Sequence, residues 1–413
     1  AMAVRLSAIR MGSGGRRLRS RQHFALVLAI IVALAAAGCA PQLLRNPVPA
    51  KAYAAPLPTG LGDVRYWGDQ LPPHLSRLIE EKFQQVVTNR PWLVTNPKNP
   101  LAFLALSGGG SDGAYGAGVL VGWTAAGTRP EFEIVTGIST GALIAPFAFL
   151  GSHYDHVLTE LYTTYSTKDV VETDFLAGVL GGAAVTEVTK LEQLIERYIS
   201  TEVLHKIAIE HARGRRLLIG TTNLDAQRPV IWDMGAIASR GTPESATLFR
   251  KVLLASASIP AVFPPVLINI DEDDGVHDEM HVDGGTTSQV FFLPPAVLSA
   301  GLKNKSKSAS LRKLYVILNN KLDPEYEAVK PTTFAIARRS ISTLIKSAGR
   351  GDLFRLRETA LASGVGMRIA AVPDSFEGRS TEPFDLDYMR LLYQLGYQQA
   401  ATGYSWHDGP LGP

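Results

Sequence analysis

Hydrophobic residues along most of the chain follow two alternating spacings. Short unbroken apolar runs, such as LAFLAL at 101–106, are typical of strands buried on both faces of a sheet. Between these runs, apolar residues recur every three or four positions, as in amphipathic helices. We expect strands at 101–106, 132–136, 216–222, 229–233, 266–270 and 313–319, and helices at 113–126, 141–150, 188–199, 246–256, 332–349 and 385–400. This alternation predicts an α/β fold, with a mostly parallel sheet sandwiched by helices in a single domain.

The first 38 residues have a different pattern. Six arginines and no acidic residue precede an unbroken apolar run at 24–37, which is too short to span a bilayer but is typical of a signal peptide. The run ends at Gly38 and Cys39, the single cysteine of the chain. This ending resembles a bacterial lipoprotein processing site, in which Cys39 becomes the lipidated first residue. The alternative is an ordinary signal peptide that leaves Cys39 as a free thiol.

The resemblance to a lipoprotein implies a location and a domain order. Ala40 provides no signal for retention in the inner membrane, so we expect a lipid anchor in the bacterial cell envelope, with the outer membrane preferred. Five prolines between positions 41 and 58 predict an extended tether. The expected order is therefore a signal peptide at 1–38, a Pro/Ala-rich tether at 39–73 and one folded domain at 74–413, with its motifs within about 100–290 and a helical extension after about 330.

Composition and charge exclude several classes of protein. With 46% hydrophobic and 19% charged residues and one cysteine, the chain is not a disordered, fibrous or disulfide-stapled protein. The formal net charge is +3, from 41 basic and 38 acidic residues, but removing the six arginines of the first segment leaves 35 basic against 38 acidic. The folded part therefore provides no electrostatic reason to expect nucleic acid as a partner.

Consecutive glycines follow the first expected strand, in the segment SGGGSDG at 107–113. A strand followed by glycines and the start of a helix directs backbone N–H groups toward one point, so the turn is predicted to bind an anion. The same glycines match the dinucleotide-binding spacing G-x-G-x-x-G. That interpretation requires an acidic residue at the end of the next strand, whereas Glu131 and Glu133 lie at its start.

The second strand leads directly into GISTG at 137–141, followed by an apolar helix. G-x-S-x-G between a strand and a helix is typical of a nucleophile elbow, in which a strained turn exposes the serine hydroxyl. A second match surrounds Ser111, but Ser111 lies in the middle of the glycine loop. We therefore predict that Ser139 is the nucleophile; the alternative is that both serines are ordinary turn residues.

A serine nucleophile needs a base, and the chain offers two candidates. In the order of an α/β-hydrolase triad, which ends on a late histidine, His407 fits, although it lies close to the C-terminus. The other candidate is Asp283, which precedes Gly284 and Gly285 after a strand-like stretch. A tight turn there would bring its carboxylate near a neighbouring hydroxyl.

Taken together and in this order, the glycine loop at 108–113, the elbow at 137–141 and Asp283-Gly284-Gly285 resemble the patatin-like acyl hydrolase (phospholipase) family. The resemblance extends over roughly 100–290 and includes the stretches TNLD at 222–225 and ASASIP at 255–260. It implies a patatin-like fold, a dyad of Ser139 and Asp283 without histidine, and a lipid ester as substrate. It also implies that the oxyanion hole consists of the amides of Gly108, Gly109 and Gly110. This chemistry requires no metal, and we expect no cofactor.

The expected function is that of a serine acyl hydrolase of the phospholipase A, lysophospholipase or esterase type, held at a membrane surface by its N-terminal lipid. The family's loop normally carries Arg or Lys where this chain has Asp112, so cationic support for the oxyanion or for a lipid phosphate is absent. Two alternatives remain: a non-catalytic lipid- or protein-binding lipoprotein with the same fold, and an esterase with a triad that uses His407.

Two further segments have competing interpretations. Six acidic residues fall within 271–279, which predicts a solvated hairpin loop; a calcium loop of the EF-hand type would need glycine where Asp274 stands. The apolar, glycine-rich segment 175–185 is either buried or a lid over the acyl site.

Overall fold

The computed structural model describes residues 45–51, 64–70, 88, 101–171, 189–260, 262–272, 275–293, 312–404 and 406–407. They belong to one compact unit, formed by Arg45–Thr173 and Val188–Pro413. The signal-peptide segment with Cys39 and the segment 175–185 lie outside the described residues.

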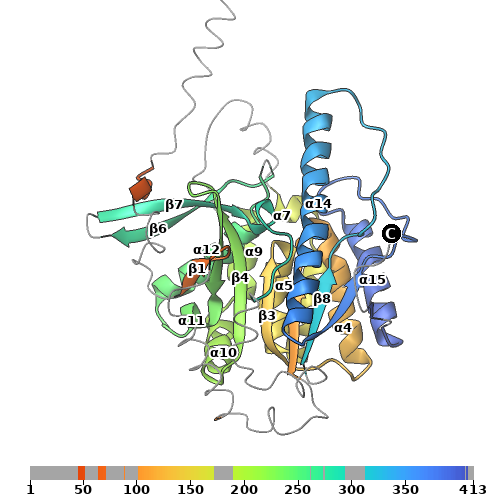
Figure 1. The fold of residues 1–413 in the computed structure, drawn as a ribbon, viewed down its shortest axis with the longest axis horizontal. Helices are drawn as coiled ribbons and strands as arrows, with labels where there is room; N and C mark the ends of the chain where they lie inside the picture. Colours follow the sequence, from red (N-terminus) through yellow and green to blue (C-terminus); the bar gives the residue numbers. More distant parts are fainter. Residues whose placement is uncertain are drawn as a thin grey trace, which may run out of the picture. The chain divides into compact units, whose positions relative to one another are not determined.

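The described residues form a sheet of nine strands (Figure 1). Five strands are parallel, in the spatial order β4 (Arg216–Asn223), β3 (Phe132–Ile138), β2 (Leu101–Leu106), β8 (Arg312–Leu318) and β9 (Gly366–Ala371). The sheet continues past β4 with β5 (Arg228–Asp233), which is antiparallel to β4, and then with β1 (Arg65–Trp67), which is antiparallel to β5. The antiparallel hairpin of β6 (Val266–Glu272) and β7 (Gly275–Asp283) joins it through β4. The predicted fold class, a mostly parallel α/β sheet, is confirmed.

Helices cover both faces of this sheet, and alternate residues of β2 show the two layers. Ala102, Leu104 and Leu106 face the larger core, whereas Phe103 and Ala105 face a smaller core. The larger core includes residues of α4 (Gly113–Ala125), α5 (Thr140–Leu150), α6 (Asp155–Thr163), α7 (Thr167–Val170), α9 (Lys190–Tyr198), α10 (Thr201–Ala212), α11 (Met234–Ala238), α12 (Pro243–Ser256) and α15 (Leu386–Ala401). On the opposite face, α14 (Thr333–Ala362) closes the smaller core (Figure 1). Short 3₁₀ turns lie at Gly110–Asp112, Ser152–Tyr154 and Gly284–Thr286.

The segment expected to be a tether contacts the folded body in two places. Backbone hydrogen bonds join Asn46 and Val48 to Asp278 of β7, and β1 pairs with β5. The side chains of Val48, Val64 and Trp67 are buried. The body therefore includes residues well before the expected boundary at 74, because apolar side chains in this proline-rich region add to the core.

The C-terminal part also differs from the expected helical extension. β9 adds a parallel strand next to β8, so this region completes the sheet. α14 continues to Ala362 rather than ending near 349, because Leu353, Leu356 and Ala360 are buried at helical spacing in the smaller core.

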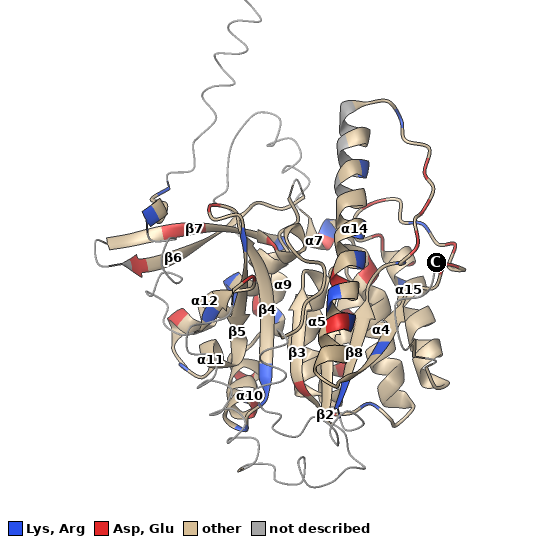
Figure 2. Ribbon diagram, viewed as in Figure 1, with Lys and Arg blue, Asp and Glu red and all other residues tan. Residues whose placement is uncertain are grey.

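Charged residues are distributed over the described elements with both signs interspersed (Figure 2). On α14, for example, Arg339 and Lys346 form ion pairs with Glu327 and Glu325 of the preceding segment. Among the described helices, none combines the length and hydrophobicity needed to cross a membrane.

Candidate active site

Strand β4 brings the two catalytic candidates together. Along 218–223 one of its edges pairs with β5, so β3 and β7 share the other edge. β3 ends there with Ile138 opposite Gly220, and β7 ends with Asp283 opposite Thr221. Because these positions of β4 are adjacent, the residue after β3, which is Ser139, meets the last residue of β7.

Ser139 occupies a strained turn between β3 and α5. Its φ and ψ are 54° and −125°, a backbone conformation that residues other than glycine rarely adopt. Its N–H donates to Ser256 Oγ at 3.0 Å, and this hydroxyl donates to the carbonyl of Gly220 at 2.7 Å. The turn therefore has the geometry of a nucleophile elbow, with the serine at the positive end of the α5 dipole.

The side chains of Ser139 and Asp283 are in direct contact. Ser139 Oγ donates to Asp283 Oδ2 at 2.6 Å, while the N–H of Gly285 donates to Oδ1 at 2.7 Å. Burial raises the pKa of Asp283 to about 7, although both hydrogen bonds oppose this shift. A carboxyl group with a pKa near neutrality, bonded to a serine hydroxyl, is suited to take a proton from it.

His407, the base of the alternative triad, lies elsewhere. It pairs through its backbone with Ile369 of β9, which stands three strands from β3. At about 4.8 Å per strand, this places β9 about 14 Å away. His407 borders a different cavity of about 420 Å³, which contains Asp323 and Asp374. Within the described part of the chain, the Ser139 hydroxyl is hydrogen-bonded to Asp283 and to no histidine.

The glycine loop lies against the nucleophile. A Cβ added to Gly108 would lie 3.3 Å from Ser139 Cβ. Gly109 has φ 157°, and a Cβ there would lie 2.2 Å from the carbonyl oxygen of Asn319, so a side chain does not fit. Asn319, just after β8, holds Ser107 through its own backbone N–H and Nδ2, both at 2.8 Å.

The predicted oxyanion hole needs a correction at Gly108. The N–H of Gly108 donates to the carbonyl of Gln289 at 2.9 Å and is therefore not available to a substrate. The N–H groups of Gly109 and Gly110 donate no hydrogen bond to any residue that the structure describes. Two of the three expected donors thus remain available.

Ser139 and Gly110 line an apolar cavity of about 80 Å³. Its wall includes Leu143 and Phe147 of α5, aliphatic and aromatic side chains of α9, and Phe384, just before α15. Such a lining suits a hydrocarbon chain better than a polar group.

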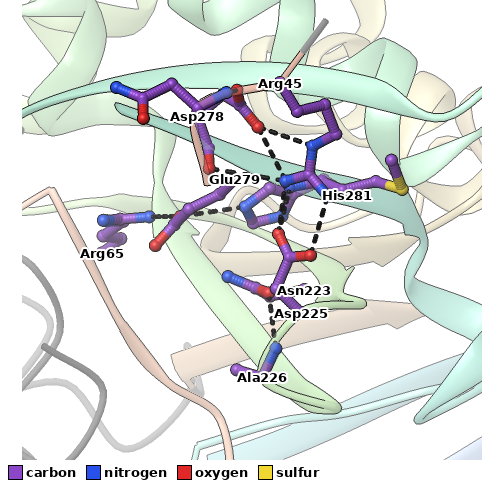
Figure 3. Close-up of polar contacts among 10 residues, drawn as sticks. Arg45, Arg65, Asn223, Asp225, Ala226, Asp278, Glu279 and His281 are labelled. Carbon is purple, nitrogen blue, oxygen red and sulfur yellow. Dashed lines mark hydrogen bonds and ion pairs between the residues drawn. The ribbon is translucent and has the colours of Figure 1, made fainter. Parts of the chain in front are cut away.

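A buried polar network holds β7 in place two residues before Asp283, and Figure 3 shows its members Arg65, Glu279 and His281. His281 Nδ1 lies 2.9 Å from Thr221 Oγ1, and its Nε2 lies 3.1 Å from Glu279 Oε2. Burial lowers the pKa of His281. Burial would raise the pKa of Glu279, but the hydrogen bond with His281 and the charge of Arg65 hold it at about 2. The network ties β7 to β4 and β1.

The acidic stretch 271–279 is part of the β6–β7 hairpin, and two of its carboxylates are paired. Asp278 accepts from Arg45 Nε at 2.7 Å, and Arg45 also donates to both carboxylate oxygens of Asp225 (Figure 3). Glu279 is buried against Arg65. The stretch therefore forms the expected hairpin, but Asp278 and Glu279 are paired with arginines rather than solvated. Among the described residues, no group of three or more His, Cys, Asp or Glu is arranged to hold a metal ion.

Several residues that organise the site were not predicted from the sequence. Gln289 connects the two halves of the site: its carbonyl accepts from Gly108, and its Nε2 donates to the carbonyl of Gly285 at 2.9 Å. Asp352 of α14 in turn accepts from the N–H of Gln289 at 2.6 Å. Asn319, a polar residue directly after a buried strand, had a recognisable signal, whereas Gln289 and Asp352 had none.

The comparisons with known proteins concern the same region. Residues 104–296 match the model of the family described as patatin-like phospholipase, in agreement with the predicted patatin-like fold. VipD from Legionella pneumophila is a similar solved structure, with TM-score 0.33 and 12% identity over 74% of this chain and 66% of that chain. Human GIVD cytosolic phospholipase A2 is another similar solved structure, with TM-score 0.34 and 11% identity over 82% of this chain and 64% of that chain. The chain thus spans about two thirds of the length of each. No curated protein matches the sequence.

Proposed function

We propose that this chain is a serine acyl hydrolase that cleaves lipid acyl esters with a dyad of Ser139 and Asp283. The observation that carries the proposal is the 2.6 Å hydrogen bond between the two side chains, with Ser139 lining an apolar cavity. The match of residues 104–296 to the patatin-like phospholipase model supports a lipid ester as substrate.

In the acylation step, Asp283 Oδ2 accepts the hydroxyl proton while Ser139 Oγ attacks the ester carbonyl. The negative charge that develops on the carbonyl oxygen is stabilised by the amides of Gly109 and Gly110, at about 2.7–4 kcal/mol for a well-directed donor. Collapse of this intermediate breaks the ester bond, and Asp283 returns the proton to the departing alcohol. The acyl group stays on Ser139, with its chain in the apolar cavity.

In the deacylation step, water replaces the alcohol. Asp283 accepts a proton from the water as it attacks the acyl-enzyme, and the carboxylic acid leaves as Ser139 regains its proton. Burial of Asp283 keeps its pKa near 7, so the same group exchanges protons in both directions near neutral pH.

A fluorophosphonate probe tests the nucleophile. Intact mass should show one adduct on the wild-type protein and none on Ser139→Ala. A folded wild-type protein that forms no adduct at Ser139 would instead support the non-catalytic, lipid- or protein-binding alternative.

We further propose that a lipid on Cys39 anchors the protein in the outer membrane of the bacterial cell envelope. The support is the sequence around Cys39. Incorporation of labelled palmitate should be lost in Cys39→Ser, together with membrane association; a Cys39→Ser protein that remains labelled would disprove the assignment.

A further inference from the structure

The glycine loop is held by a segment far away in the sequence. The 3₁₀ turn Gly110–Asp112, which includes one of the proposed oxyanion amides, presents two polar side chains. Ser111 Oγ accepts from the N–H of Phe384 at 2.8 Å, and Asp112 Oδ1 accepts from the hydroxyl of Tyr388 at 2.8 Å. Phe384 and Tyr388 both lie beyond the range 104–296 of the family match.

The bond from Tyr388 gives Asp112 a structural role. Burial raises the pKa of Asp112 to about 7, and the hydrogen bond from Tyr388 opposes that shift. The position that carries a cation in the resembling family thus holds an acceptor here. The acceptor connects the loop to the first turn of α15 rather than to a substrate charge.

The segment before α15 is itself firmly held. Phe384 has φ 58°, a conformation that is strained for a residue with a side chain and persists only when the surroundings impose it. Asp385 accepts from the N–H and hydroxyl of Thr381 at 3.0 and 2.8 Å, and caps α15 through the N–H of Tyr388. Thr167 of α7 donates to the carbonyl of Pro383.

The packing of α15 on α4 fixes the distance between the segment and the loop. A Cβ on Gly118 of α4 would lie 2.1 Å from the carbonyl oxygen of Tyr393, so the two helix backbones are in contact. α4 begins at Gly113, directly after the glycine loop. The loop is therefore held between α4 and the segment that precedes α15.

The same segment forms part of the acyl cavity. Phe384 lines the same cavity as Ser139 and Gly110, and Met389 of α15 lines it as well. The ring of Phe384 packs against Phe263, with centroids 6.2 Å apart. One residue thus supplies both a backbone donor to the loop and an apolar wall to the cavity.

We propose that the segment 381–388, here called the C-terminal strap, positions the oxyanion loop and limits the acyl group that the cavity accepts. Its Phe384 N–H and Tyr388 hydroxyl act as positioning groups through Ser111 and Asp112, and the Phe384 ring determines acyl selectivity. This inference rests on the proposed acyl hydrolase function.

Tyr388→Phe tests positioning by removing a single hydroxyl. On a short-chain aryl ester, kcat should fall about 10- to 100-fold with little change in KM, because displaced oxyanion donors weaken transition-state binding alone. Tyr397→Phe is the matched control on the same helix and should behave as the wild-type protein. Equal kcat values in the two variants would overturn the positioning role.

A double-mutant comparison separates positioning from simple loss of stability. Asp112→Ala should lower kcat as Tyr388→Phe does, and the double variant should be no worse than the poorer single one, because both remove the same bond. Asp112→Asn keeps an acceptor oxygen and should lose less. Fluorophosphonate labelling rates, measured on the folded fraction of each variant, should follow the same order. Additive losses would contradict the proposal.

Phe384→Gly tests selectivity while keeping the backbone N–H and the positive φ. The ratio of kcat/KM for a dodecanoyl over a butyryl aryl ester should rise about tenfold, since the ring no longer limits the cavity. Phe384→Leu should give an intermediate ratio. An unchanged ratio in an active enzyme would overturn this inference alone. If the wild-type protein hydrolyses no ester, or Ser139→Ala retains full activity, the proposed function fails, and this inference with it.

Discussion

At the scale of single residues, the site is organised around one carboxyl group. Asp283 is buried and hydrogen-bonded to Ser139 and Gly285, yet no cationic side chain contacts it among the described residues. Without a positive charge to offset its desolvation, its pKa rises toward neutrality.

Asp283→Asn preserves the shape of the side chain but removes the proton acceptor. We expect kcat/KM on a soluble aryl ester to fall about 10²- to 10⁴-fold, which is the usual contribution of a general base. His407→Ala should leave activity unchanged. Near-normal activity in Asp283→Asn, or a large loss of activity in His407→Ala, would support the alternative triad with His407.

The pH dependence of activity should report the same group. Since the base must be ionised in the free enzyme, kcat/KM should rise with pH through a midpoint near 7 and then level off. An acidic limb with a midpoint near 4 would mean that Asp283 titrates as an ordinary carboxyl group.

The contribution of Asp283 to folding stability should fall with rising pH, whereas activity should rise. Between the ordinary Asp pKa of about 3.9 and about 7, folded Asp283 keeps a proton that the unfolded chain has lost, so its contribution to stability is lost as pH rises. Asp283→Asn removes this penalty. The free energy of unfolding of the variant relative to wild type, from urea titrations, should therefore increase from pH 4.5 to pH 7.5; a constant difference would contradict the raised pKa.

At the scale of elements, the glycine loop depends on its neighbours for its shape. β8 ends at Leu318, and Asn319 then lies so close to Gly109 that no Cβ fits between them. The loop is therefore determined by the strand beside it as much as by its own glycines.

Gly109→Ala should displace the loop, because the added Cβ would lie 2.2 Å from a backbone oxygen. We expect a loss of at least about 100-fold in kcat, from misplaced oxyanion donors. Gly351→Ala is a matched control in α14, where the nearest atom, Arg355 Nη1, lies 3.7 Å away. It should keep full activity and gain about 0.5–1 kcal/mol of stability. If Gly109→Ala is as active as this control, the loop does not form the oxyanion hole.

At the scale of the whole described unit, residues on either side of the family match support the elements that carry the site. Arg45 binds Asp225 after β4 and Asp278 of β7. The C-terminal strap, which follows α14 in the chain, contacts the glycine loop through Tyr388 and Asp112. The elements around Ser139 are thus supported from outside the range of the family match.

Arg45→Met should lower the free energy of unfolding by about 1–2 kcal/mol at pH 7, because it leaves two partly buried carboxylates without their cation. Burial favours a higher pKa for Asp225, but the hydrogen bond from Arg45 holds that pKa below its ordinary value. The stabilisation of the folded protein by Arg45 should therefore disappear as pH falls below 4. Lys206→Met, which removes an exposed pair with Glu202, is the control and should have little effect. A loss that is the same at pH 3 and pH 7 would rule out an electrostatic origin.

The sequence by itself determined the alternation of strands and helices and the local geometry around Ser139 and Gly109. Both signals are short-range, because a strand followed by glycines or by G-x-S-x-G specifies its own turn. The family resemblance implied that Ser139 pairs with Asp283, 144 positions away, although no local pattern did. Only the tertiary structure shows how they meet, since this contact depends on two strands sharing one edge of β4. It also decided that Gln289 occupies the Gly108 amide, and that Tyr388 meets Asp112 across 276 positions. Contacts of this kind leave no local pattern, because each is created by the packing of elements that the chain brings together from a distance.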